Sequence, residues 1–232
     1  MSANTAPTPR SGVKSTALGL IGFPVAGLVA ALIDSNEGTD TPPPELYAIA
    51  AAHADAIFVS ALIFMVSAVL TVPAAVGIVG LVQSRGATLA RLGATFLVLG
   101  GFGHMGFATW QIMLSRVPDE SGRAELTAFL ERQQSVMTAV LLPLLLSIVL
   151  GVLLLVIALH RAGVVPRWFL VTTIAMVVFD VVLNSSPLEG SKIALVFVWA
   201  SLAGLFGYLA IRVLRASDVG SMPSTHRDSV AT

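Results

Sequence analysis

The chain has 232 residues, of which 56% are hydrophobic and only 11% are charged. A soluble domain carries about 25% charged residues, so this composition indicates a polytopic integral membrane protein. The formal net charge is zero, which gives no indication of a nucleic-acid partner, and the chain has no cysteine, which excludes disulfides, thiol catalysis and thiolate metal sites. The abundance of alanine and glycine is typical of a bacterial protein from a GC-rich genome.

Six apolar runs predict an all-α fold, a six-helix transmembrane bundle. A helix needs about 20 apolar residues to cross a hydrocarbon core of ~30 Å, with about 17 as the lower limit. The runs cover residues 17–33, 56–82, 92–114, 136–159, 168–184 and 193–211 of a single membrane domain, 16–215. The polar ends, 1–15 and 216–232, are expected to be disordered cytoplasmic tails. The first run could instead be a signal peptide, although no clean cleavage site follows it before Asp34.

The distribution of lysine and arginine predicts the orientation of the bundle. With the N-terminus in the cytoplasm, nine basic residues lie on the cytoplasmic side and four lie outside. The nine are Arg10, Lys14, Arg85, Arg91, Arg161, Arg167, Arg212, Arg215 and Arg227, and the four are Arg116, Arg123, Arg132 and Lys192. Both termini are therefore expected in the cytoplasm of a cell whose cytoplasmic membrane holds the protein, with the lipid bilayer as its main partner.

The segment 115–135 between the third and fourth runs has the pattern of a helix. Pro118 and Asp119 form a helix-start signature, and Leu126 and Phe129 fall on one face. This segment is either an amphipathic helix lying on the outer surface or an extension of the fourth helix above the membrane, and we favour the extension. Prolines at 24, 73 and 143 lie inside runs and are expected to kink their helices.

Two ionisable residues lie deep inside predicted spans, where such groups are costly and by default functional. His104 follows Arg91 by 13 residues, and Asp180 follows Arg167 by 13 residues. Both arginines should mark the cytoplasmic interface, so at 1.5 Å per residue the two side chains lie level, about 20 Å above it. If the third and fifth spans are neighbours, we expect His104 and Asp180 to meet.

Helical periodicity places further polar residues on the inward faces of three spans. His104 shares a side with Gly100 and Gln111, and the glycine should allow another helix to pack closely. The same periodicity predicts one internal cavity that opens outward. Its expected lining is Ser60, Ser67, His104, Gln111, Asp180 and Asn184, with Trp110, Trp199 and Tyr208 as walls or interface anchors. A purely structural interpretation also stands, in which His104 and Asp180 form a buried hydrogen-bonded pair that fixes helix register.

The favoured functional interpretation is a membrane-embedded enzyme that acts on a lipophilic, isoprenoid-like small molecule. In an apolar site Asp180 would hold a proton at neutral pH and act as a general acid, and His104 would orient it or accept the proton at the end. In size and helix content the chain resembles the small integral-membrane terpene cyclases, which start their chemistry from membrane carboxylates. That resemblance implies acid-catalysed cyclisation or isomerisation without a cofactor. No motif of that family maps onto these residues.

Three alternatives remain open. A level histidine and aspartate would also suit a small proton-coupled transporter or channel, for which a homo-oligomer would supply the missing bulk. A zinc site would need His53, His104 and Asp180 together, whereas a haem would need a second level histidine, and His160 lies at the opposite face. A non-catalytic accessory protein would use its acidic, proline-rich outer loop near Pro42. We expect neither a metal nor another cofactor.

Overall fold

The described part of the chain is helical and contains no strand. The structure, a computed structural model, describes residues 10–34, 43–83, 85–116, 120–184 and 192–220. Its helices are α1 (Arg10–Ile33), α2 (Pro43–Ala52), α3 (Ala54–Leu81), α4 (Ala87–Leu114), α5 (Glu120–Arg161), α6 (Arg167–Asn184) and α7 (Lys192–Gly220). The expected all-helical fold is therefore confirmed. Where the structure describes the two expected disordered tails, they are helical, because α1 begins at Arg10 and α7 ends at Gly220. The rest of both tails lies outside the described residues.

Five helices are long and apolar enough to cross a membrane. They are α1, α3, α4, the part of α5 after residue 138, and α7, and α6 contributes a shorter apolar stretch, Arg167–Phe179. Their outward faces expose large apolar side chains, among them Leu18 at 64%, Val76 at 68% and Val171 at 63%. Such a surface is a liability in water and is typical of helices surrounded by lipid.

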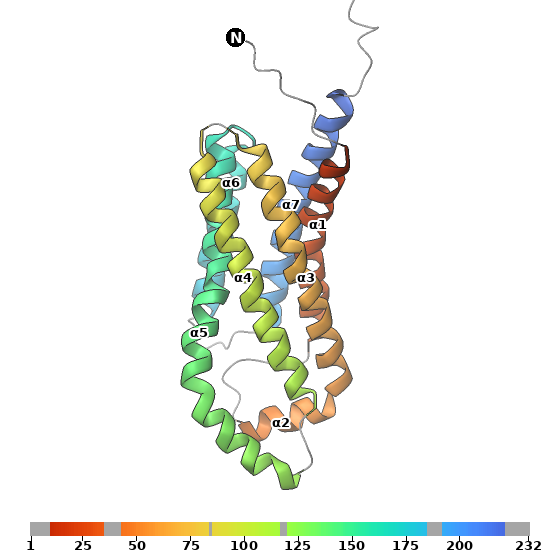
Figure 1. The fold of residues 1–232 in the computed structure, drawn as a ribbon, viewed down its shortest axis with the longest axis vertical. Helices are drawn as coiled ribbons and strands as arrows, with labels where there is room; N and C mark the ends of the chain where they lie inside the picture. The colour runs from red at the N-terminus through yellow and green to blue at the C-terminus, as the bar shows by residue number, and fades with distance from the viewer. Residues whose placement is uncertain (1–9, 35–42, 84, 117–119, 185–191, 221–232) are drawn as a thin grey trace, which may run out of the picture.

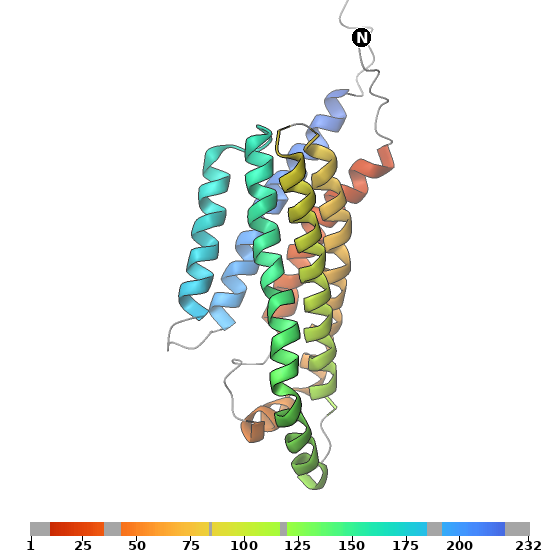
Figure 2. The ribbon, with the colours of Figure 1, turned by 60° about the vertical axis from the view of Figure 1, so that its left-hand side comes forward.

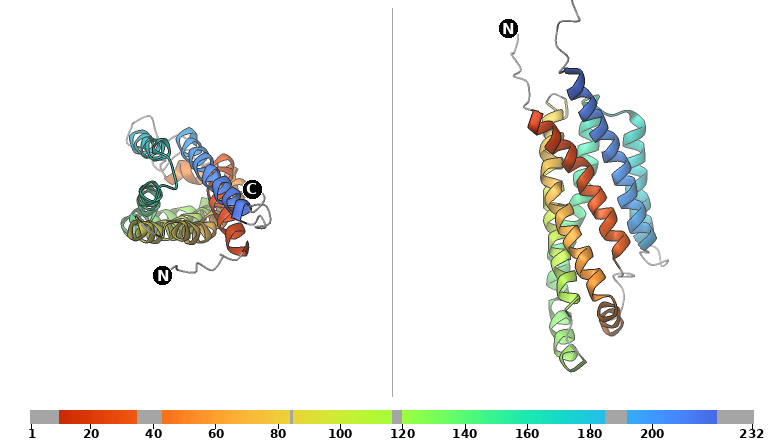
Figure 3. Two further views of the ribbon diagram at one scale, coloured as in Figure 1. Left: turned by 90° about the horizontal axis from the view of Figure 1, so that it is seen from above. Right: turned by 90° about the vertical axis from the view of Figure 1, so that its right-hand side faces the viewer.

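The long helices run alternately up and down in an open bundle (Figure 1). α3 packs on α1 and α4, α4 packs on α5, and α1 packs on α7, while α6 lies against α5 and α7. Seen from above, α7 lies beside α1 on one side of the bundle, and α6 lies beside α5 on the other (Figure 3). The buried core between them is almost entirely apolar, with Leu20, Phe23, Leu97, Leu155 and Phe206 among its most buried side chains.

The two ends of the bundle differ in charge. The basic end, at the top in Figure 1, holds the α3–α4 connection with Arg85 and the α5–α6 connection between Arg161 and Arg167. The N-terminal end of α1 and the C-terminal end of α7 lie at this basic end as well. We call the opposite end the α2 end, because α2 lies across it (Figure 2).

α2 was absent from the prediction, and it caps one end of the bundle. Its Tyr47 and Ala50 are buried against Ile57 of α3 and Leu114 of α4, and Leu126 of α5 packs beside them. The chain begins this helix with prolines, which suit the first helical turn because their missing N–H would be unbonded there anyway. At ten residues α2 is too short to register as a span.

α5 is one continuous helix of 42 residues that begins at Glu120. At 1.5 Å per residue it is about 63 Å long, roughly twice the thickness of a hydrocarbon core. The preferred expectation, that the segment 115–135 extends the fourth helix, is therefore confirmed from residue 120 onward. Pro24, Pro73 and Pro143 all lie within continuous helices, α1, α3 and α5.

Small residues bring α4 and α5 into close contact. A Cβ atom added to Gly100 would come within 2.6 Å of the Cβ of Ile148, and one added to Gly103 would come within 2.8 Å of the Leu144 backbone. Gly151 of α5 approaches Leu97 in the same way, at 2.5 Å from its backbone nitrogen. The expectation that the glycines around His104 admit a neighbouring helix is confirmed, and that neighbour is α5.

Candidate functional site

His104 points into the bundle from the middle of α4. Its Nδ1 lies 3.0 Å from the carbonyl oxygen of Gly100, one turn earlier in the same helix. A carbonyl oxygen only accepts, so in this hydrogen bond Nδ1 carries the proton and Nε2 of the neutral ring carries the lone pair. Nε2 has no hydrogen-bond partner among the described residues. The imidazole is therefore held in one tautomer, and its basic nitrogen makes no hydrogen bond to the described part of the chain.

Aromatic rings from two other helices surround this imidazole. Trp199 of α7 meets it edge to face, with ring centroids 5.7 Å apart, and Phe64 of α3 lies at 6.1 Å. Phe23 of α1 extends the cluster, at 5.6 Å from Trp199. These distances lie in the range of favourable aromatic pairs, and ring faces also stabilise cations. We call His104, Phe64, Trp199 and Phe23 the aromatic cluster.

Glycine makes the placement of Trp199 possible. A Cβ atom added to Gly27 of α1 would lie 2.2 Å from the indole ring, far closer than atoms in contact can be. Trp199 is thus seated against bare backbone of α1, with only 3% of its surface exposed. Of the two tryptophans expected as walls, Trp199 lies beside His104, whereas Trp110 lies in the cluster under α2.

The two serines of α3 hold helices together. Ser67 Oγ donates to the carbonyl oxygen of Phe23 at 2.7 Å, and Ser60 Oγ donates to that of Ala30 at 3.0 Å. Both acceptors belong to α1, so these hydroxyls bridge two helices in a region where other polar partners are scarce. The structure therefore places the hydroxyls of Ser60 and Ser67 in the α1–α3 contact, bonded to backbone carbonyls of α1.

Gln111 belongs to a second polar group, near the α2 end. Its Nε2 donates a 2.8 Å hydrogen bond to the Asp34 carboxylate at the end of α1, and both side chains are buried. Gln111 Oε1 and the hydroxyl of Tyr47 are buried without a hydrogen-bond partner in the described structure. Seven residues separate Gln111 from His104, which is about 10 Å along the helix, so the two polar groups form separate sites.

Asp180 and Asn184 lie in the last turns of α6, and their side chains fall outside the described residues. The buried residues of the described part of α6 are Phe169, Thr173 and Met176. α6 packs on α5 and α7, while α4 packs on α3 and α5, so α4 and α6 do not pack along each other. The packing of α4 against α6 that a direct His104–Asp180 contact assumed is therefore not found among the described residues.

His53 is too far away to share a ligand with His104. It is exposed at the junction of α2 and α3, whereas Phe64, which contacts the imidazole, lies 11 residues further along α3. That separation is about 16 Å along the helix. A zinc site built from His53, His104 and Asp180 therefore does not fit this fold.

Sequence reasoning missed Asp34 and Tyr47 as members of a buried polar group. Asp34 follows directly after the first apolar run, and in the sequence only that position hinted at its burial. Comparisons with protein-family models, with curated proteins and with solved structures find no match.

Proposed function

We propose that the protein spans a cell membrane six times, with both termini in the cytoplasm. Five helices are long enough by themselves, and α6 follows from the course of the chain. α5 ends at the basic end, and α7 begins near the opposite end and returns to the basic end (Figure 2). The chain between them must cross the bundle, and α6, with 18 residues, is long enough to do so. The arginines of the basic end favour the cytoplasm for that end.

Within this bundle we propose a site for a lipophilic molecule at the aromatic cluster, with acid–base chemistry as the activity. The observation that carries the proposal is the imidazole of His104 between Phe64 and Trp199. Its Nδ1 is fixed by a hydrogen bond, and its Nε2 has no partner in the residues that the structure describes. A basic nitrogen inside an apolar, aromatic-lined interior suits proton transfer to or from a greasy substrate. An isoprenoid is the class of substrate that fits such walls best.

Asp180 is the proposed acid. It lies four residues from the end of α6, and Trp199 lies seven residues into α7, so the two positions differ in height by about one helical turn. The carboxylic acid would transfer its proton to a carbon–carbon double bond or an epoxide, leaving a carboxylate and a substrate cation. The aromatic faces would stabilise that cation. His104 Nε2 would then accept the proton released when a new double bond forms, and proton exchange with Asp180 would restore both groups.

The test is product analysis with paired variants. The purified full chain, reconstituted in vesicles, is incubated with linear polyprenyl alcohols and terminal polyprenyl epoxides, and products are separated by mass spectrometry. The wild type should convert at least one probe, and Asp180→Asn and His104→Ala should abolish conversion while remaining folded. If both variants convert the probes at the wild-type rate and merely unfold at lower temperature, the two residues are structural and the proposal fails.

A transporter would give a different result in the same vesicles. Uptake of a solute driven by a proton gradient, with no new product formed, would replace the enzymatic proposal. Phe102→Ala is the matched control for both assays, because Phe102 lies on the outward face of α4, is 59% exposed and lies close in sequence to His104. It should leave conversion or uptake unchanged.

A further inference from the structure

An apolar groove runs between the second half of α3 and the first half of α4, outside the aromatic cluster. Its volume is about 430 Å³, and it is lined by Ala75, Val76 and Val79 of α3 and by Ala94, Thr95 and Val98 of α4. The hydroxyl of Thr95 is bonded to the carbonyl of Arg91 in its own helix, so it adds little polarity to the groove. The outward surface around the groove is exposed, as Val76 shows.

Basic and amide side chains cap this groove at the basic end of the bundle. Arg91 lies three residues before Ala94 and four before Thr95, on the same face of α4, and it is exposed. Gln83 lies four residues after Val79 and is exposed as well, and Arg85 lies in the connection between the two helices. The groove therefore has apolar walls below and two guanidinium groups above.

No acidic residue of α3 or α4 lies near the positive charge of these arginines. The sequence has no acidic residue between Asp55 and Asp119, a stretch that includes all of the groove and its cap. Gly80, beside the upper end of the groove, has open space where a side chain would stand. The site thus combines positive charge, room near the interface and an apolar channel that leads into the membrane.

We infer that this groove binds an anionic phospholipid of the cytoplasmic leaflet. One acyl chain lies between α3 and α4, and the phosphate meets Arg91 and Arg85, because guanidinium groups bind phosphate oxygens through paired hydrogen bonds. A zwitterionic lipid would bring its own cation to the same arginines and gain less. The inference rests on the membrane topology proposed above and not on chemistry at His104.

Native mass spectrometry of the full chain, released from neutral detergent micelles, tests this site. The wild type should retain phosphatidylglycerol in preference to phosphatidylcholine with the same acyl chains. Arg85→Gln with Arg91→Gln should weaken retention, by roughly fivefold for each arginine removed. The matched control is Arg161→Gln with Arg167→Gln, which removes equal charge from the other connection at the same end and should leave retention unchanged.

Two further variants test the contribution of the groove independently of the arginines and of the proposed activity. Thr95→Phe fills the groove from an exposed position and should abolish retention with both arginines present. His104→Ala should retain the lipid even if it loses all activity. The inference would be overturned if the wild type retained the two lipids equally, or if both arginine pairs lost equal retention. Full retention by Thr95→Phe would overturn it as well. So would displacement of the lipid by glycerol phosphate, which carries the phosphate but no acyl chain.

Discussion

The side-chain amide of Gln111 donates a 2.8 Å hydrogen bond to the carboxylate of Asp34, a residue 77 positions earlier in the chain. Gln111 is completely buried and Asp34 is 5% exposed. The bond joins the end of α1 to the last turn of α4, near the place where α2 crosses the bundle. A buried carboxylate requires hydrogen-bond donors, so this bond helps to hold the α2 end closed.

Replacing Gln111 by leucine should destabilise the protein. The substitution removes the amide donor from a buried carboxylate while keeping a side chain of similar size, and we expect a loss of about 1–3 kcal/mol. Thermal unfolding in detergent micelles measures the change. Gln83→Leu is the control, since Gln83 is exposed and its amide donates to the nearby carbonyl of Gly80, at the end of α3. Equal stability of Gln111→Leu and the wild type would show that the link contributes nothing.

Replacing Tyr47 by phenylalanine should stabilise the protein, in contrast to Gln111→Leu. The Tyr47 hydroxyl is buried and has no hydrogen-bond partner in the described ranges, and an unpaired buried polar group costs about 1–3 kcal/mol. Removing it while keeping the ring should raise the unfolding temperature. Tyr208→Phe serves for comparison, because Tyr208 is only half-buried. A lower unfolding temperature for Tyr47→Phe would mean that the hydroxyl makes a stabilising bond.

The bonds from α3 to α1 should make a small, measurable contribution. Ser67→Ala removes the 2.7 Å bond to Phe23, and hydrogen bonds between membrane helices contribute about 0.6 kcal/mol on average. Ser147→Ala is the matched control, because Ser147 bonds to Pro143 in its own helix. Unfolding in graded denaturing detergent should separate the two variants. Identical unfolding curves for both would remove the serines from the account of α1–α3 packing.

Gly100→Ala should loosen the α4–α5 contact. The added methyl group would lie 2.6 Å from Ile148, so the helices must separate, and overpacking of this kind costs about 1–3 kcal/mol. Gly204→Ala is the control, since nothing lies within 4 Å of a Cβ atom there, and alanine is the better helix former. We expect a lower unfolding temperature for the first variant and an equal or higher one for the second. The reverse order would contradict the helix contact described here.

Hydrophobicity alone was enough to predict the long helices, because an apolar run of sufficient length has few other stable forms. The inward face of α4 also followed from periodicity, and Gly100 and Gln111 are buried as expected. Which helices pack against each other could not be predicted, because a local sequence pattern does not indicate the partner of a helix. Ser67 was therefore expected to line a cavity together with His104, whereas its hydroxyl bonds to the carbonyl of Phe23 in α1. α2 was missed because ten residues with little amphipathic character resemble a loop.

The site was also predictable only in part, because the sequence does not show which residues meet in the tertiary structure. His104 stood out because an ionisable residue inside an apolar run is costly, and the structure surrounds it with Phe64 and Trp199. Asp34 did not stand out, because an acid at the end of a span is ordinary in an outer loop. Only tertiary structure shows that it is buried against Gln111.

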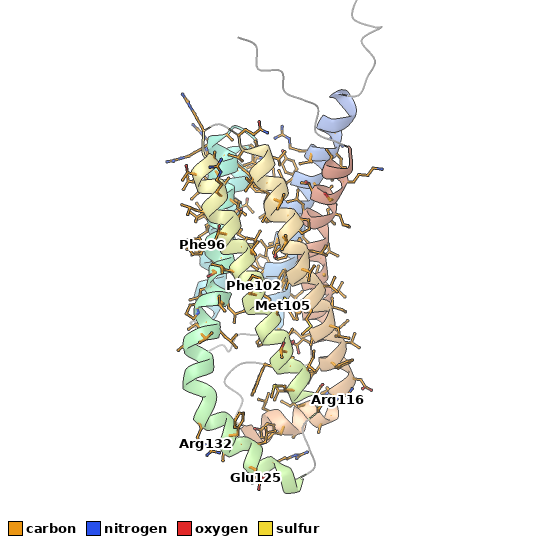
Figure 4. All side chains as sticks on the ribbon, in the orientation of Figure 1. Phe96, Phe102, Met105, Arg116, Glu125 and Arg132 are labelled. Carbon is orange, nitrogen blue, oxygen red and sulfur yellow. The ribbon has the colours of Figure 1, made fainter. Side chains whose placement is uncertain are left out.

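The central claim is that His104 and Asp180 face one internal site, and cysteine cross-linking tests it most directly. The chain has no native cysteine, so pairs can be introduced without background. In intact membranes a short bifunctional thiol reagent should link His104→Cys to Asp180→Cys. It should not link Phe102→Cys to Asp180→Cys, because Phe102 faces outward (Figure 4). Failure of the first pair, while His104→Cys still links to Phe64→Cys, would contradict the account.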